Sequence, residues 1–362
     1  MKDTTRRQFV QQIATTLGGI ALSGPSVLFA QPKPIKIAVY APSHCSLPIV
    51  HAFYNNHYQK NGVNIEIVYC RRMSEILKKI CSGEADFAQL MSPMIIQRHT
   101  NQIIEQQTSL AVTQVLGTNG GVLGISSQSK IKRIQDLVGK SIGVHSPLMV
   151  HYLIMQLLLE KYGLTQNNVH IKTVPMHQIR QALEKGQIQG FIHPEPLPTL
   201  LESQKISRSL LLTRMFWHNH PCCMLTCRKR FFDKNQQMIE DVTRATTISC
   251  LMLDNIAMRK IQIDKIYQKN TPFNKIPLAR LQQAFSSRRS DFFPFPFLSA
   301  AYVVVEQMKK SNLLPKTTHV KATARDIFQS DFAMGIFKQV ASLVPGTSIP
   351  PGLEREESFK LI

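Results

Sequence analysis

The sequence lacks, near its N-terminus, the long uninterrupted apolar stretch that a membrane-spanning helix requires. A bilayer span takes about 20 consecutive apolar residues, whereas the apolar run over residues 13–30 is broken repeatedly. The interrupting residues are Gly18, Gly19, Ser23, Gly24 and Pro25. A weakly apolar run of this kind that ends at a small residue is typical of a cleaved export signal.

An arginine pair precedes this run, in the order Thr4-Thr5-Arg6-Arg7-Gln8-Phe9-Val10. Paired arginines followed by an aromatic residue are typical of a twin-arginine export signal, and Ala30 offers a small residue for cleavage. We therefore expect residues 1–30 to be a twin-arginine signal peptide and the remaining chain to work in the periplasm. No cysteine lies at the expected cleavage site, so no lipid anchor is expected.

Acidic residues are scarce: 23 of them face 43 lysines and arginines, which gives a formal net charge of +20. Such a surplus favours an anionic ligand, an acidic partner or a negatively charged membrane face. The basic residues are scattered along the chain and no recognised nucleic-acid-binding motif occurs. We therefore expect no nucleic-acid partner.

The seven cysteines are an odd number, so at least one thiol must stay unpaired within the chain. Three of them stand in apolar helix or strand contexts and are expected in the core: Cys70, Cys81 and Cys250. The other four lie in or near predicted loops: Cys45, Cys222, Cys223 and Cys227.

Histidines accompany these loop cysteines at His44, His218 and His220. Together they could form a soft-metal site or a reactive thiol centre. The pattern His-x-His-x-Cys-Cys-x3-Cys contains no paired C-x2-C, however, and therefore fits no standard zinc module. A vicinal disulfide or ordinary buried thiols is the simpler expectation, and we expect neither a metal nor another cofactor.

A repeat organises the middle of the chain: residues 75–90 recur in outline as residues 178–193, with Gly83 aligned to Gly186. Each copy predicts an amphipathic helix that ends at the glycine and leads into a short buried strand. Two such units predict two similar lobes with a ligand cleft between them. Asp86 in the first copy corresponds to Gln189 in the second, so we expect a shared architecture rather than a symmetric site.

Alternating strand and helix patterns predict an α/β protein. We expect a first lobe over residues 31–118, a second over 119–220, a return to the first lobe with C-terminal helices over 221–345, and a polar tail over 346–362. The predicted strands are 35–40, 63–69, 86–91, 110–116, 122–125, 141–145, 169–174 and 224–227. The predicted helices are 48–60, 73–81, 147–162, 236–267, 292–310, 332–343 and one that begins at Pro196.

Five motifs in order give a resemblance to a known family. They are the tract with Gly83, Asp86, Ala88, Ser92, Pro93 and Met94; Ser146-Pro147-Leu148-Met149-Val150-His151; Gly190-Phe191-Ile192-His193-Pro194-Glu195-Pro196; His220-Pro221; and Phe293-Pro294 through Gln307-Met308. In these the chain resembles the substrate-binding proteins of nitrate/sulfonate/bicarbonate-type ABC importers, particularly the nitrate and bicarbonate branch.

The resemblance implies a type II periplasmic binding fold with two doubly wound lobes, a hinge cleft and a helical C-terminal extension. Such a protein closes its lobes on a small solute and presents it to a membrane permease. We therefore expect a monomeric binding protein and no enzyme, with a small anionic or heteroaromatic solute and an ABC permease as partners. A twin-arginine-exported metal- or thiol-dependent protein or enzyme on the same fold is the alternative, and a solute sensor is a third reading.

Loops at the carboxyl ends of strands supply the candidate ligand-binding residues, because ligands bind at that edge of doubly wound sheets. They are Cys45, Ser46, Ser92, Pro93, Asn119, His151, Glu195, His220 and Cys223. Several have a structural alternative: His151 could lie on a helix face, Glu195 and Ser92 could cap helices, and His220 could shape the crossover between lobes.

Three departures from the nitrate-binding members argue against nitrate and bicarbonate as ligands. Those members have a tryptophan where this chain has Cys70-Arg71-Arg72-Met73, and a glutamine where Gly121 stands. They also have an acidic residue and a lysine where this chain has Cys222 and Cys223. The aromatic wall, an amide and a cation of the nitrate pocket are thus all missing.

Overall fold

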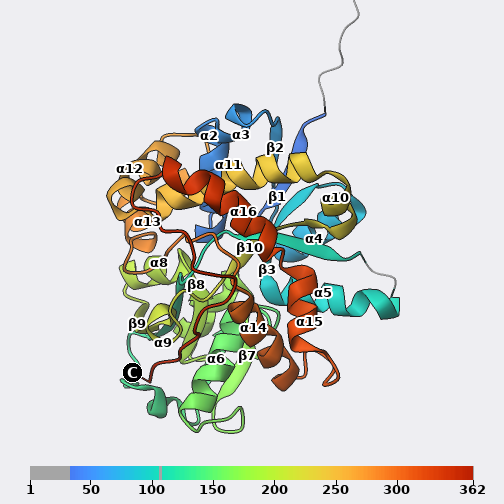
Figure 1. Cartoon of the computed structure of the whole chain (residues 1–362). Coiled ribbons are helices and arrows are strands. Elements are labelled where there is room, and N and C mark those ends of the chain that lie inside the picture. The colour runs from blue at the N-terminus through green and yellow to red at the C-terminus, as the bar shows by residue number, and fades with distance from the viewer. Residues whose placement is uncertain (1–32, 106–107, 362) are drawn as a thin grey trace, which may run out of the picture. The chain divides into compact units, whose positions relative to one another are not determined.

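The computed structural model describes residues 33–105 and 108–361 (Figure 1). The predicted signal peptide, residues 1–30, lies outside the described residues. Residues from Pro34 onward form a compact unit of their own. Within the described part of the chain, no helix has both the length and the apolar character needed to cross a membrane.

The first sheet has the strand order β2-β1-β3-β10-β4. β1 is parallel to β2 and β3, whereas β10 is antiparallel to both of its neighbours. Its strands are β1 (Ile35–Val39), β2 (Ile65–Tyr69), β3 (Phe87–Met91), β4 (Leu110–Val115) and β10 (Cys223–Arg228).

The second sheet repeats this arrangement in the order β7-β6-β8-β5-β9. β6 is parallel to β7 and β8, and β5 is the antiparallel strand between β8 and β9. Its strands are β5 (Gly121–Ser126), β6 (Ser141–Val144), β7 (His170–Thr173), β8 (Gly190–Pro194) and β9 (Ser207–Leu212). The predicted α/β class with two similar sheets is confirmed.

The sequence repeat corresponds to one helix-to-strand unit in each sheet. α4 (Met73–Ser82) leads through Gly83 into β3, and α7 (Ile179–Glu184) leads through Gly186 into β8. Both glycines have positive φ, +86° and +67°, a left-handed conformation that favours glycine after a helix. The unit is therefore the same in both sheets, as the aligned glycines predict.

Asp86 and Gln189 also have the same role, although only one is charged. The backbone N–H of Lys36 donates to Asp86 Oδ2 at 3.0 Å, and that of Ser141 donates to Gln189 Oε1 at 2.9 Å. Each side chain thereby ties its strand to the neighbouring parallel strand. The difference between the two copies concerns charge and not architecture.

The chain passes between the sheets twice, and the two crossings lie side by side. Residues 116–120 connect β4 to β5, and residues 213–222 connect β9 to β10. The N–H of Asn119 donates to the carbonyl of His220 at 3.1 Å, and Thr118 exchanges two backbone hydrogen bonds with Asp291. Segments distant in sequence therefore meet between the two sheets.

Helices cover the sheets (Figure 1). The α11 helix packs against α2, α3, α12 and α16, while α14 packs against α5, α6 and α15. Their bounds are α2 (Leu47–Tyr54), α3 (His57–Lys60), α5 (Ser92–Glu105), α6 (Val150–Lys161), α8 (Leu197–Ser203), α9 (Thr213–Phe216), α10 (Lys229–Lys234), α11 (Gln236–Asp254), α12 (Ile256–Tyr267), α13 (Leu278–Ala284), α14 (Leu298–Lys310), α15 (Val320–Ile327) and α16 (Ser330–Val340).

Three helix predictions are wrong in extent, each for a local reason. The predicted helix 236–267 is two helices, because the Asn255 side chain accepts hydrogen bonds from the N–H groups of Ala257 and Met258 and starts α12 anew. The predicted helix 48–60 breaks at Asn56, whose φ is +58°. The predicted helix 292–310 begins only at Leu298, because Pro294 and Pro296 disfavour helical backbone before them.

Candidate functional site

The predicted site residues come from equivalent edges of the two sheets. His44, Cys45 and Ser46 form a short 3-10 turn after β1, and Ser92 begins α5 directly after β3. In the second sheet, His151 lies in the first turn of α6, after β6, and Glu195 follows β8. Cys222 and Cys223 lead into β10, which runs antiparallel and so starts at the edge where β3 ends.

His151 is fully buried, and neither of its ring nitrogens has a hydrogen-bond partner among the described residues. Its ring packs edge-on against His220, with centroids 6.2 Å apart. Burial, and next the neighbouring histidines, hold its pKa well below the ordinary value. The neutral ring offers one donor and one acceptor to a ligand.

Gly121 makes room for the His151 ring. A Cβ at this position would lie 2.7 Å from the imidazole and 2.7 Å from Thr213 Oγ1, which is closer than real Cβ contacts. Glycine at position 121 is therefore a packing requirement of His151 in this chain.

His220 and Asn119, both predicted to bind ligand, are engaged inside the crossovers. His220 Nε2 lies 2.7 Å from the hydroxyl of Thr213, and burial lowers the pKa of His220 to about 3. The Asn119 side-chain amide donates to Asp291 Oδ2 at 2.6 Å and to Asn219 Oδ1 at 3.2 Å. The bond from Asn119 to Asn219 fastens the two crossings to each other, and the contact of His220 with Thr213 lies within the second crossing.

Glu195 is occupied by protein partners. It accepts hydrogen bonds from the N–H of Thr199 at 3.1 Å and from the Thr199 hydroxyl at 3.0 Å, and it pairs with Arg289. Burial raises its pKa to about 7, against the opposing effect of Arg289. The carboxylate thus serves the start of α8, the structural role that was the alternative to ligand contact.

The two candidate serines, Ser46 and Ser92, differ in whether a protein group occupies the hydroxyl. The Ser46 hydroxyl donates to the Ser43 carbonyl at 2.9 Å and accepts from the Ser43 N–H at 3.1 Å, which completes a capping box. The Ser92 hydroxyl is fully buried and has no partner among the described residues. Pro93 follows it, buried, in the first turn of α5. Of these three residues, only Ser92 keeps a polar group available to a ligand.

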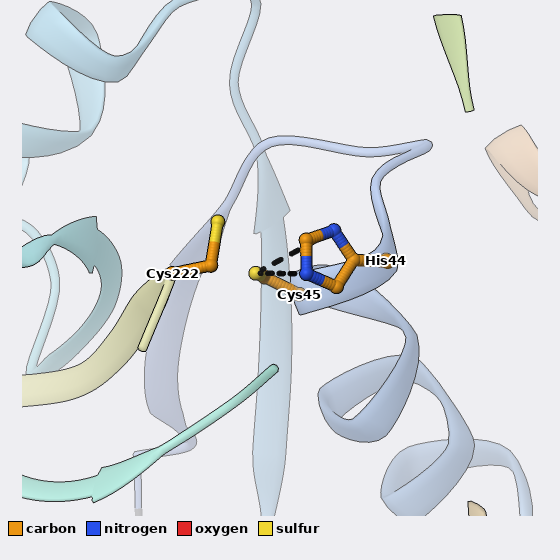
Figure 2. Close-up of side chains that lie close together, drawn as sticks. All are labelled: His44, Cys45 and Cys222. Carbon is orange, nitrogen blue, oxygen red and sulfur yellow. Dashed lines mark hydrogen bonds between the residues drawn. The ribbon is translucent and has the colours of Figure 1, made fainter. Parts of the chain in front are cut away.

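Three side chains of metal-ligating types converge between the end of β1 and the start of β10: one ring nitrogen of His44 and the sulfurs of Cys45 and Cys222 all lie within 4.8 Å of one another. The Cys45 sulfur lies 3.3 Å from His44 Nε2. Figure 2 shows that sulfur between the imidazole and the Cys222 side chain. We call this set the His44–Cys45–Cys222 cluster; all three residues are buried.

Cys223 adjoins the cluster through hydrogen bonds with the sulfurs of Cys222 and Cys45. Burial raises the pKa of the Cys45 thiol well above its usual range. The thiols of Cys222 and Cys45 lower the pKa of Cys223, whose sulfur also accepts from Gln89 Nε2 at 3.7 Å.

The predicted histidine–cysteine group is only partly assembled. All seven cysteines are free thiols, so Cys222 and Cys223 form no vicinal disulfide. His218 is exposed, and Cys227 lies in β10 opposite Phe87 and Ala111, further along the strand. The residues that meet are His44, Cys45 and Cys222, which lie where β1 ends and β10 begins.

Reasoning from the sequence missed three contributors to this junction: Gln89, Thr213 and Arg289. Gln89 could have been noticed, because it is the polar residue in the otherwise apolar strand Phe-Ala-Gln-Leu-Met. Arg289 carries no comparable local signal, since its partners Glu195 and Glu202 are 94 and 87 residues away. Thr213 stands only seven residues before His220, but no local pattern connects the two.

Comparison with known proteins gives consistent relatives. The model of the NMT1-like family matches residues 30–265. The nitrate/nitrite binding protein NrtA of Nostoc sp. strain PCC 7120 is 22% identical over 282 residues, which are 69% of this chain and 63% of that protein. The bicarbonate transport ATP-binding protein CmpC of Synechocystis sp. strain PCC 6803 is 26% identical over 205 residues, 52% of this chain and 31% of that protein. The matched regions thus span less than two thirds of these relatives.

A solved structure shows the same fold. The periplasmic nitrate-binding protein NrtA from Synechocystis PCC 6803 superimposes with a TM-score of 0.80 at 17% identity, covering 90% of this chain and 93% of that one. The predicted type II periplasmic binding fold is confirmed. The resemblance to substrate-binding proteins of nitrate- and bicarbonate-type importers is confirmed as well.

Proposed function

The chain belongs to the NMT1-like family, and from that premise we propose that it is a solute-binding protein of an ABC importer. In this proposal it is exported by the twin-arginine route to the periplasm, works there as a monomer and performs no catalysis. It captures a small solute between the two sheets and delivers it to a membrane permease.

The proposal rests on the observation that His151 is buried without hydrogen-bond partners among the described residues. A buried polar group without a partner costs about 1–3 kcal/mol of stability. His151 leaves both ring nitrogens unpaired at the junction of the two sheets, and Gly121 is needed to accommodate its ring. A bound ligand would supply the hydrogen bonds that the protein itself does not provide to these nitrogens.

The charges near the junction support a solute of low charge. Arg289 pairs with Glu195 and Glu202, and Arg259 pairs with Asp291, so these cations are already neutralised. The remaining donors are neutral: His151, the Ser92 hydroxyl and backbone N–H groups at the starts of α5 and α6. We propose a small anion of low charge or a heteroaromatic molecule, either of which presents acceptors and donors to an imidazole.

The sequence departures from the nitrate-binding members argue against nitrate and bicarbonate as the solute, and two features of the junction support that proposal. Cys222 and Cys223, which are buried thiols, stand where the resemblance places an acidic residue and a lysine in the nitrate-binding members. The His151 ring fills the space where a side chain on residue 121 would begin.

A thermal-shift panel of oxyanions, sulfonates and pyrimidines on the full chain tests the proposal. A solute at 100 times its Kd stabilises the folded state by about 2.7 kcal/mol, and we expect His151→Leu to abolish that shift. Without solute, the unfolding free energy of His151→Leu should exceed that of the wild type by about 1 kcal/mol, because two unpaired polar atoms are removed.

Substitution of an exposed histidine, His319→Gln, is the matched control and should keep the full shift. A solute that stabilises His151→Leu as much as the wild type would place the binding site elsewhere. A ligand-free His151→Leu protein that is destabilised would assign His151 a structural role.

A further inference from the structure

The His44–Cys45–Cys222 cluster has the composition of a metal site. Its donors are one imidazole and two thiols, which are the side chains that thiophilic d10 metal ions prefer. In a tetrahedral zinc site, a sulfur at about 2.3 Å and a nitrogen at about 2.0 Å from the ion lie about 3.5 Å apart. The Cys45 sulfur lies 3.3 Å from His44 Nε2 and 3.9 Å from His44 Nδ1, so either ring nitrogen lies within about 0.4 Å of this value.

The imidazole of His44 is oriented as a ligand would be. Its ring donates a hydrogen bond to the backbone carbonyl of Glu195, which leaves the other ring nitrogen with a free lone pair. Metal-ligating histidines commonly donate their second nitrogen to a backbone carbonyl in this way. Gly117 and Gly120 pack so closely on the ring that a Cβ at either position would clash with it, so the imidazole is held in place.

The charge balance selects a divalent ion. His44 is fully buried, and imidazole binds metal ions as the neutral ring. Two thiolates and a neutral imidazole around a divalent cation carry no net charge, which is the favourable state in a buried site. A monovalent cation with the same two thiolates would leave a buried negative charge.

We propose that His44, Cys45 and Cys222 bind a thiophilic divalent metal ion, of which Zn²⁺ is the representative. Three protein ligands leave the fourth tetrahedral position to a small neutral molecule. This inference goes beyond the proposed function, because solute capture requires no metal ion.

Titration of the reduced, metal-free full chain with Co²⁺ tests the site, since cobalt reports thiolate ligation by an intense near-ultraviolet charge-transfer band. We expect one ion per chain and displacement of the band by Zn²⁺. Cys45→Ser and Cys222→Ser should each weaken Zn²⁺ binding by more than about 100-fold, beyond the 10–100-fold cost of outer-shell changes.

Cys81→Ser is the control, because that half-buried thiol lies on α4 and is no member of the cluster. Far-ultraviolet circular dichroism establishes that each variant is folded. His44→Asn is a gentler variant that keeps an N–H for the Glu195 carbonyl and lacks the ring lone pair; it should also lose the band.

Three results would overturn the inference: no thiolate band with Co²⁺, a band that survives both cysteine substitutions, or tight binding of Cu⁺ with no binding of Zn²⁺. The test is separate from that of the proposed function. His151→Leu should bind Zn²⁺ normally while losing the solute shift. A wild type that binds a solute but no metal refutes the metal site alone, and one that binds metal but no solute refutes the proposed function alone.

Discussion

At the scale of single residues, the buried histidines divide into satisfied and unsatisfied groups. His51 in α2 lies fully buried with Nδ1 3.0 Å from Ser249 Oγ and Nε2 3.0 Å from Gln262 Oε1. His151 is equally buried and has no such partners among the described residues. Because both rings are desolvated, folding holds them neutral, and hydrogen bonding separates a structural histidine from a candidate ligand.

His51 should make stability depend on pH. Desolvation lowers its pKa from 6.5 to about 4 in the folded protein, so the unfolded chain binds the proton first as pH falls. The contribution of His51 is complete above pH 6.5 and is lost progressively toward pH 4. We expect His51→Gln to flatten the fall of the unfolding free energy over this range by up to about 1.4 kcal/mol per pH unit.

Urea denaturation across this pH range measures the effect. His319→Gln changes an exposed histidine and should keep the wild-type slope. Equal slopes for the His51 and His319 variants would contradict the linkage.

At the scale of elements, the helix–glycine–strand unit is what the two sheets share. Gly83 and Gly186 each end a helix in the left-handed conformation and lead into the middle strand of its sheet, β3 or β8. The left-handed turn reverses the chain at the helix end and directs it into the sheet. The strand that follows delivers Ser92 in one sheet and Glu195 in the other.

Alanine at either glycine should destabilise the protein by about 1–2 kcal/mol, the cost of a left-handed conformation for a residue with a Cβ. At Gly186 a methyl group would enter open space, so its cost is conformational alone; at Gly83 it would make only ordinary contact with Arg228. Chemical denaturation of the two variants measures these changes.

Gly335→Ala is the matched control, because Gly335 lies within α16, has open space beside it and does not have positive φ. It should stabilise the protein by about 0.5–1 kcal/mol. Neutral substitutions at both Gly83 and Gly186 would show that the left-handed turns are dispensable.

At the scale of the whole molecule, the C-terminal segment fastens the second crossing between the sheets. The predicted polar tail contains Glu357, which accepts a hydrogen bond from Trp217 Nε1 at 2.7 Å, and Phe359, whose ring centroid lies 5.5 Å from that of Trp217. The N–H of Lys360 donates to the carbonyl of Phe216 at 2.9 Å. The segment therefore supports the crossing that leads to His220 and Cys222.

Phe359→Ala should lower the unfolding free energy by about 2 kcal/mol, since a half-buried aromatic contact is lost. Leu361→Ala removes a side chain that is 64% exposed and should change stability by less than about 0.5 kcal/mol. Urea denaturation compares the two variants, and equal effects would mean that the terminal segment does not support the crossing.

Local patterns in the sequence were sufficient for the strands other than β9, for the repeated unit and for the two crossings. Strand periodicity and a glycine after a helix depend on neighbouring residues alone, so they can be recognised without a partner. Helix ends were less predictable: Asn255 starts a new helix through its own side-chain hydrogen bonds, and the apolar pattern continues across it.

The roles of the site residues depended on tertiary contacts. Glu195, His220 and Asn119 stay predictions as ligands, and only the tertiary structure shows that each also contacts a protein partner: Arg289, Thr213 and Asp291, respectively.

The assembly of His44 and Cys45 with Cys222 has the same origin. His44 and Cys45 lie far from Cys222 in the sequence, and no spacing rule connects them. They meet because β1 ends and the antiparallel β10 begins at the same edge of one sheet. Composition therefore supplied the candidate ligands, and only strand order and direction decided which of them lie within reach of one ion.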